Sequence, residues 1–159
     1  MTFDKHCLRL YAVTDRAWVG RQSLLEQVED ALRGGATCVQ LREKELPEEE
    51  FLREAVEMAE LCRRYHVPFL INDNVEIALR CGAAGVHVGQ DDMAAAEARR
   101  LLGPDKIVGV SVHTPDEAEK ALRDGADYLG VGAVFSTSTK TDVSVLTHEA
   151  LRAICGATP

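Results

Sequence analysis

The sequence predicts an α/β fold with a parallel sheet, arranged as a TIM-type (βα)₈ barrel of which about six strand–helix units are present. Apolar runs with strand character alternate with segments of helical periodicity, and consecutive parallel strands need a crossover helix between them. Three glycine–alanine pairs, at Gly35, Gly82 and Gly125, precede the second, fourth and sixth expected strands at similar spacing. This repeat of paired units favours a barrel over an open, doubly wound sheet.

The elements are bounded by ordinary start and stop signals. The first strand is expected at 8–14, and Ser23 and Glu26 form a capping box that begins the first helix. Gly34-Gly35 ends that helix. The apolar run 37–39 predicts a buried second strand, and Pro47 begins a long amphipathic helix. Later strands are expected at 69–71, 85–88, 107–113 and 127–132, and later helices at 75–80, 93–102, from Thr114 onward, and at 147–154.

The chain is expected to form a single, partial domain over residues 1–159, because no linker or low-complexity segment interrupts the alternation. Complete barrels of this type typically have about 250 residues, so two of the eight units are missing. The first and sixth strands would then be unpaired edges. Another chain, or a second copy in a homo-oligomer, would be one way to cover them.

Composition excludes several classes of protein. The formal net charge of −8 and the pI near 5.1 disfavour a nucleic-acid partner, which needs dispersed positive charge. No apolar stretch approaches the ~20 residues that span a bilayer, and no signal-peptide pattern is present, so we expect no membrane partner and a cytoplasmic location. The 5 cysteines are scattered without a C-x-x-C pair and are expected to be reduced core residues.

Polar side chains gather at the expected carboxyl ends of strands two to six, the face that carries the active site in a barrel. After the second strand, alternation would send Gln40, Arg42 and Lys44 to one face. Two cations beside an amide suit a multiply charged anion such as a diphosphate. The alternative is that this segment is the end of an edge strand, where the chain runs out of the core and the three side chains are exposed to solvent. The other polar positions are Asn72, Asp73, Gln90, Asp91, Asp92, Ser111, His113 and 136–140.

Two of these residues, Asp73 and Asp92, could hold a hard cation, since magnesium typically takes one or two carboxylates together with phosphate oxygens. The alternative is that each aspartate caps the helix expected just after it. Spacing alone favours the caps.

A hydroxyl-rich segment lies further along the chain, where Thr137, Ser138 and Thr139 precede Lys140. Such a loop beside a lysine could cradle a phosphate. The alternative is a solvated turn.

Six motifs follow one another in order from 8 to 154. They are LYAVTD at 10–15, QLREK at 40–44, IND at 71–73, GVHVGQDD at 85–92, GVSVH at 109–113, and GVGAVF at 130–135 with TSTK at 137–140. In this order they resemble the motifs of the thiamine phosphate synthase family.

The resemblance implies a TIM barrel that joins an aminopyrimidine methyl diphosphate to a thiazole phosphate, releasing pyrophosphate and forming thiamine monophosphate. It implies that Asp73 and Asp92 bind Mg²⁺, against the reading from spacing alone. Arg42, Lys44 and Lys140 would stabilise the departing diphosphate. The pyrimidine diphosphate would be bound by Gln40, Arg42, Lys44, Asn72, Ser111 and Lys140, and the thiazole phosphate by Thr137, Ser138 and Thr139.

The family pattern continues with two more strands, whose loops complete the thiazole phosphate site, and this sequence lacks them. Two alternatives to a working synthase therefore remain. One is an inactive or regulatory protein that binds a phosphate ligand. The other is a thiazole tautomerase of the same fold. It ranks lower because diphosphate departure needs the full set of charged residues, which tautomerisation does not need: Arg42, Lys44, Asp73, Asp92 and Lys140.

Overall fold

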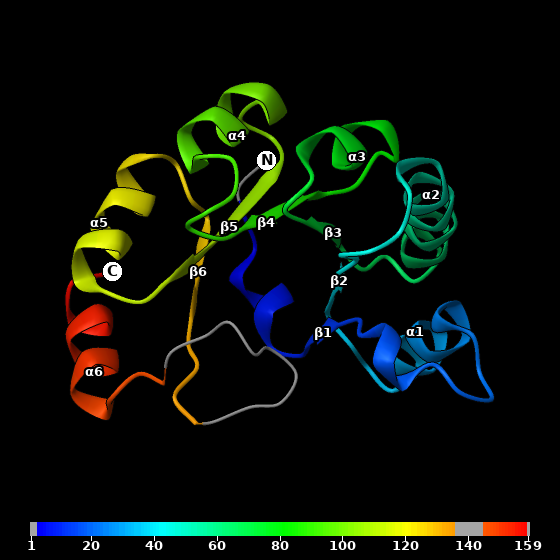
Figure 1. Ribbon diagram of the computed structural model, residues 1–159, viewed down its shortest axis with the longest axis horizontal. Coiled ribbons are helices and arrows are strands. Elements are labelled where there is room, and N and C mark those ends of the chain that lie inside the picture. Colours follow the sequence, from blue (N-terminus) through cyan, green and yellow to red (C-terminus); the bar gives the residue numbers. More distant parts are fainter. Residues whose placement is uncertain (1–2, 136–144, 159) are drawn as a thin grey trace.

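The computed structural model describes residues 3–135 and 145–158. A parallel sheet in the order β1-β2-β3-β4-β5-β6 forms its centre, and the helices lie along the outer side of the curved sheet (Figure 1). The strands are β1 (Tyr11–Val13), β2 (Cys38–Leu41), β3 (Phe69–Asn72), β4 (Gly85–Val88), β5 (Ile107–Val112) and β6 (Tyr128–Val131). The helices are α1 (Leu24–Arg33), α2 (Glu48–Arg64), α3 (Val75–Arg80), α4 (Ala95–Leu102), α5 (Pro115–Arg123) and α6 (His148–Gly156).

This architecture confirms the predicted alternation of strands and helices. Strands that are neighbours in sequence are also neighbours in the sheet, as in a barrel and unlike a doubly wound sheet. Within the part of the chain that the structure describes, β1 and β6 are the two sheet edges, as expected.

The largest difference from the prediction is at the first strand, which was expected at 8–14 and spans only Tyr11–Val13. The segment before it, Lys5–Leu8, forms a 3₁₀ helix instead. The Thr37 hydroxyl accepts a hydrogen bond from the Leu10 N–H at 2.8 Å and donates one to the Cys7 carbonyl at 2.8 Å. The Leu10 N–H thus bonds to a side chain and not to the backbone of β2, so the strand begins later.

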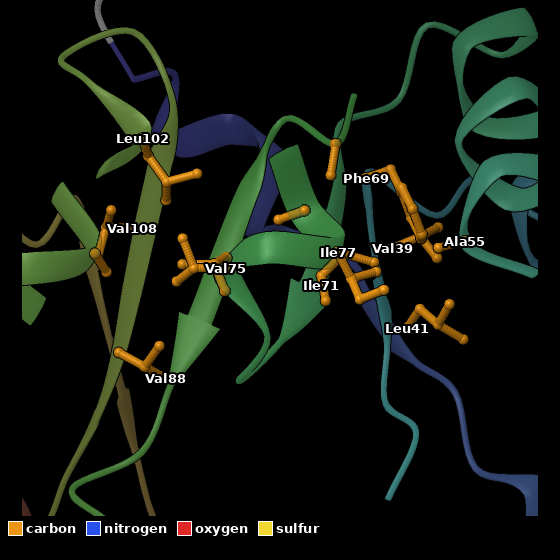
Figure 2. Packing of buried hydrophobic residues seen from close by; sticks show 14 of the residues in the cluster. Val39, Leu41, Ala55, Phe69, Ile71, Val75, Ile77, Val88, Leu102 and Val108 are labelled. Carbon is orange, nitrogen blue, oxygen red and sulfur yellow. The ribbon is translucent and has the colours of Figure 1, made fainter. Parts of the chain in front are cut away.

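The core fills the space between the outer face of the sheet and the helices. Figure 2 shows Val39 and Leu41 of β2 and Ile71 of β3 on the side where Ala55 of α2 lies, and all four are fully buried. Alternate residues of each strand therefore supply the core. The expectation that the cysteines are core residues is confirmed for Cys38 and Cys62, which are buried, and is wrong for Cys155, which is exposed.

The first helix depends on its predicted capping box. The Ser23 hydroxyl accepts from the Glu26 N–H at 3.3 Å, and the Glu26 carboxylate accepts from the Ser23 N–H at 2.7 Å. Ser23→Ala should lower the free energy of unfolding by about 1 kcal/mol, because the backbone donor at residue 26 loses its partner. Urea unfolding measures the change, with Ser23→Thr as the control that keeps a hydroxyl. Equal stability of wild type and Ser23→Ala would contradict this role of the cap.

Across 3–135 and 145–158 no helix has the length and apolar character needed to cross a bilayer.

Candidate active site

Two adjoining clefts lie at the carboxyl end of the sheet. The first, called here the anion cleft, has a volume of about 190 Å³. The second, called the inner cleft, has a volume of about 420 Å³ and lies on the inner face between β1 and β6. They share His87, Ser111 and His113 in their linings. The other predicted site residues of the anion cleft are Arg42, Lys44, Asn72, Asp73, Gln90, Asp91 and Asp92.

A larger cavity of about 730 Å³ lies at the opposite, amino end of the strands, against the N-terminal segment. Its lining includes Thr37, Pro68 and Ile107, which precede or begin β2, β3 and β5. In barrels this end contributes to stability, whereas chemistry is located at the carboxyl end. We therefore assign the active site to the two smaller clefts.

The two cations of the QLREK motif reach the anion cleft from the loop after β2, because the strand ends at Leu41. The Arg42 N–H donates to the buried Thr14 hydroxyl at 2.9 Å, which ties the loop to the end of β1. Glu43, between the two cations in sequence, pairs with Arg16 at 2.7 Å and does not line the cleft. The sequence did not indicate these supports, because Thr14 and Arg16 lie far away along the chain.

Gln40 differs from the other two members of its expected face. It is buried in β2, and its amide Nε2 donates to the Tyr11 hydroxyl at 2.8 Å. It lines the inner cleft, and Arg42 and Lys44 line the anion cleft. The predicted alternation of side chains therefore ends with β2 at Leu41, and it does not extend to Arg42 and Lys44.

The reading of Asp73 and Asp92 as helix caps is wrong. The N-cap of α3 is Asn74, whose side chain accepts from the Ile77 N–H at 2.9 Å. Helix α4 begins at Ala95 after Ala94, which makes no side-chain cap bond, and Asp92 instead accepts from the Gly89 N–H at 2.8 Å. Both carboxylates therefore line the anion cleft.

Asp73 is held in an unusual environment. Its backbone has φ +64°, a left-handed conformation that aspartate and asparagine adopt more readily than most residues. Burial, followed by the neighbouring Asp92 carboxyl, raises the pKa of Asp73, although contact with the Lys44 ammonium lowers it. The Asn72 amide also donates to the Asp73 carboxylate at 2.6 Å. A cation placed between the two carboxyls would relieve their repulsion.

No group of three or more His, Cys, Asp or Glu side chains suited to a metal occurs among the residues whose placement is described. Two carboxylates nevertheless fit magnesium, which commonly completes its shell with water and substrate phosphate.

The inner cleft contains a polar network that sequence reasoning missed. From β1 to β5 it links the side chains of Tyr11, Tyr128, His87 and Ser111 by hydrogen bonds of 2.7, 2.9 and 2.9 Å. The sequence could have indicated this network through strand alternation, which places Tyr11, His87 and Tyr128 on the inner face of the sheet. The predicted residues Thr137, Ser138, Thr139 and Lys140 lie outside the described residues.

Known proteins resemble this chain in sequence and in fold. The family model described as thiamine monophosphate synthase matches residues 10–159. A thiamine-phosphate synthase of Clostridioides difficile is 50% identical over 150 residues, which cover 94% of this chain and 71% of the relative. A probable thiamine biosynthetic bifunctional enzyme of Oryza sativa, named as chloroplastic, is 52% identical over 158 residues, which cover 97% of this chain but only 28% of the rice protein.

A solved structure shows the same fold. The thiamine phosphate pyrophosphorylase of Pyrococcus furiosus superposes with a TM-score of 0.83 and 37% sequence identity, covering 96% of this chain and 72% of the other. The six-stranded sheet is therefore a partial TIM barrel, as predicted. With a family match over nearly its whole length, this chain belongs to the thiamine monophosphate synthase family.

Proposed function

We propose that this chain carries thiamine phosphate synthase activity. It joins an aminopyrimidine methyl diphosphate to a thiazole phosphate and releases pyrophosphate and thiamine monophosphate. The observation that carries the proposal is the anion cleft, where Arg42 and Lys44 share one lining with Asp73 and Asp92. Opposite charges placed together in this way suit a diphosphate–magnesium pair. The names of two relatives, thiamine-phosphate synthase and thiamine phosphate pyrophosphorylase, support this reaction.

The cations of the anion cleft would bind the diphosphate. Arg42 offers a planar fork of donors that matches phosphate oxygens, and Lys44 contributes a compact charge. Lys44 also contacts Asp73. Asn72 and Ser111 supply neutral hydrogen-bond donors on the same lining, and Lys140 is proposed as a third cation from the sequence motif.

Magnesium would be held by Asp73 and Asp92, where it would neutralise charge that develops on the leaving diphosphate. The protein residues then act without a nucleophile of their own. The bond between the pyrimidine methylene carbon and the diphosphate oxygen breaks, and both electrons leave with pyrophosphate. The thiazole nitrogen forms the new bond to the pyrimidine-stabilised carbocation.

The inner cleft would position the pyrimidine ring beside the departing diphosphate. Its lining combines the aromatic residues Tyr11 and Tyr128 with the amide of Gln40. Thr137, Ser138 and Thr139 are proposed to hold the thiazole phosphate, on the sequence motif alone. Holding both substrates in line would supply much of the remaining rate enhancement. The reaction is proposed to take place in the cytoplasm, where the free cysteines would stay reduced.

The test is product formation by the purified chain given both substrates, with and without magnesium. Thiamine monophosphate and pyrophosphate should form in equal amounts and only with magnesium. A series of protein concentrations shows whether activity requires association. Ligand binding without turnover at every concentration would contradict the transferase and favour the phosphate-binding alternative. Turnover of a thiazole tautomer without the pyrimidine would favour the tautomerase.

Magnesium binding should depend on pH through Asp73. Because the pKa of this carboxyl is raised, protons should compete with the metal at a higher pH than for an ordinary aspartate, whose pKa is about 3.9. Calorimetric titration with magnesium chloride over a pH series should show affinity falling as the pH decreases toward the raised pKa. Circular dichroism at each pH is the control for unfolding. Constant affinity down to about pH 4 would contradict the role of Asp73.

A further inference from the structure

We infer that Tyr128 is a positioning residue, which acts through His87 to turn the Ser111 hydroxyl toward an anionic oxygen of the ligand. The inference rests on the proposed function, because it assumes that the anion cleft binds a diphosphate. The Tyr128 hydroxyl lies 2.9 Å from His87 Nδ1, and His87 Nε2 lies 2.9 Å from Ser111 Oγ. Ser111 lines both clefts, so its hydroxyl lies where the network meets the ligand site.

Two glycines make this network sterically feasible. In the sheet register, Gly109 of β5 lies between His87 of β4 and Tyr128 of β6. A Cβ at Gly109 would be 2.1 Å from the Tyr128 ring, so only glycine lets the ring lie across β5 toward His87. A Cβ at Gly130 would be 3.0 Å from the imidazole. The ring centroids of His87 and Tyr128 are consequently 5.5 Å apart.

At the Tyr11 end of the network, the Gln40 amide acts as a hydrogen-bond donor. The buried Gln40 amide donates to the Tyr11 hydroxyl at 2.8 Å, and the Tyr11 and Tyr128 hydroxyls are 2.7 Å apart. If Tyr11 donates its own hydrogen to Tyr128, then Tyr128 donates to His87 Nδ1. A neutral imidazole must then carry its hydrogen on Nε2 and donate it to Ser111. In this direction the hydroxyl hydrogen of Ser111 is left for a further acceptor.

If the hydrogen bonds of the network are donated in the reverse direction, the hydrogen without an acceptor lies at the other end. Ser111 would donate to His87, the imidazole Nδ1–H to Tyr128, and Tyr128 to Tyr11. The Tyr11 hydrogen would then be left over next to the Gln40 amide donor. In the portion of the chain that is described, neither Ser111 Oγ nor the Tyr11 hydroxyl has another hydrogen-bond partner. An anionic oxygen in the anion cleft gives Ser111 an acceptor and gives Tyr11 none, so a bound diphosphate selects the direction from Gln40 to Ser111.

The consequence is a preorganised donor. A serine hydroxyl rotates freely, but an imidazole N–H that points at its oxygen leaves the hydrogen to face the ligand. The two ring nitrogens of His87 are therefore held in defined roles by Tyr128 on one side and Ser111 on the other.

The first experiment measures the tautomer of His87. The chain is labelled with ¹⁵N-histidine, saturated with magnesium and inorganic pyrophosphate, and the His87 signals are assigned by their loss in His87→Gln. The expected spectrum shows a neutral ring protonated on Nε2. Tyr128→Phe keeps the ring but removes the hydroxyl, and it should abolish this preference. A wild-type ring protonated on Nδ1, or on both nitrogens, would overturn the inference.

The second experiment measures pyrophosphate affinity in a mutant cycle. Ser111→Ala should weaken binding about tenfold, and Tyr128→Phe roughly three- to tenfold, because each removes or misdirects one hydrogen bond. In the Ser111→Ala background, Tyr128→Phe should cost nothing further, since the group that it positions is absent. Equal losses in both backgrounds would show a merely structural role and overturn the inference.

The matched control is Tyr65→Phe, which removes a hydroxyl that donates to Glu29 at 3.0 Å and lines neither cleft. It should change neither the tautomer nor the affinity, and a change as large as that in Tyr128→Phe would count against the inference. If wild type binds no pyrophosphate, the proposed function and the inference fail together. Binding with the wrong tautomer contradicts the inference alone.

Discussion

Lys44→Ala is expected to lower the rate of thiamine monophosphate formation by about 10²–10³-fold. The ammonium of Lys44 lies on the anion cleft, where it would stabilise negative charge that grows on the leaving diphosphate. Loss of one preorganised donor to such charge typically has an effect of this size. The free energy of unfolding should change by less than about 1 kcal/mol, because the Lys44 side chain is half exposed. Single-turnover rates and urea unfolding measure the two effects.

Lys120→Ala provides the matched control. Lys120 also pairs with an aspartate, Asp124, but it lies in α5 and lines neither cleft. Its removal should leave the transfer rate unchanged. If Lys44→Ala and Lys120→Ala have equal transfer rates, Lys44 does not act on the diphosphate.

Asp73→Asn is expected to lower activity without lowering stability. Without one of the two carboxylates, magnesium-dependent transfer should fall by about a hundredfold or more. Stability near neutral pH should not fall, because the environment of Asp73 already disfavours its charged form. Asparagine also tolerates the left-handed backbone at this position.

The sign of the pH effect follows from the raised pKa of Asp73. Above about pH 4 the unfolded chain ionises this carboxyl more readily than the folded chain does. Wild type should therefore lose stability as the pH rises from the unfolded to the folded pKa of Asp73, and Asp73→Asn should lack that loss. Urea unfolding across this range measures the difference. Asp124→Asn, outside the clefts, controls for a general effect of lost charge, and full magnesium-dependent activity of Asp73→Asn would contradict metal binding there.

Elements with local signals could be predicted from sequence. The capping box at Ser23, the helix at 75–80 and the strand at 85–88 agree with the structure, because caps, glycine and apolar periodicity act within one or two turns of chain. The first strand was predicted too long, because bonds from Thr37 decide where pairing begins. That partner lies on another strand, beyond the reach of local patterns.

The same distinction applies to the site. The sequence by itself determined the parallel order of the strands and the gathering of Arg42, Asp73 and Ser111 at their carboxyl ends, since alternation and topology follow from local periodicity. Only the tertiary structure decided that Asp73 and Asp92 do not cap helices and that Tyr128 reaches His87 across Gly109. Those outcomes depend on which side chain fills the space between strands, and packing fixes this only when distant segments come together.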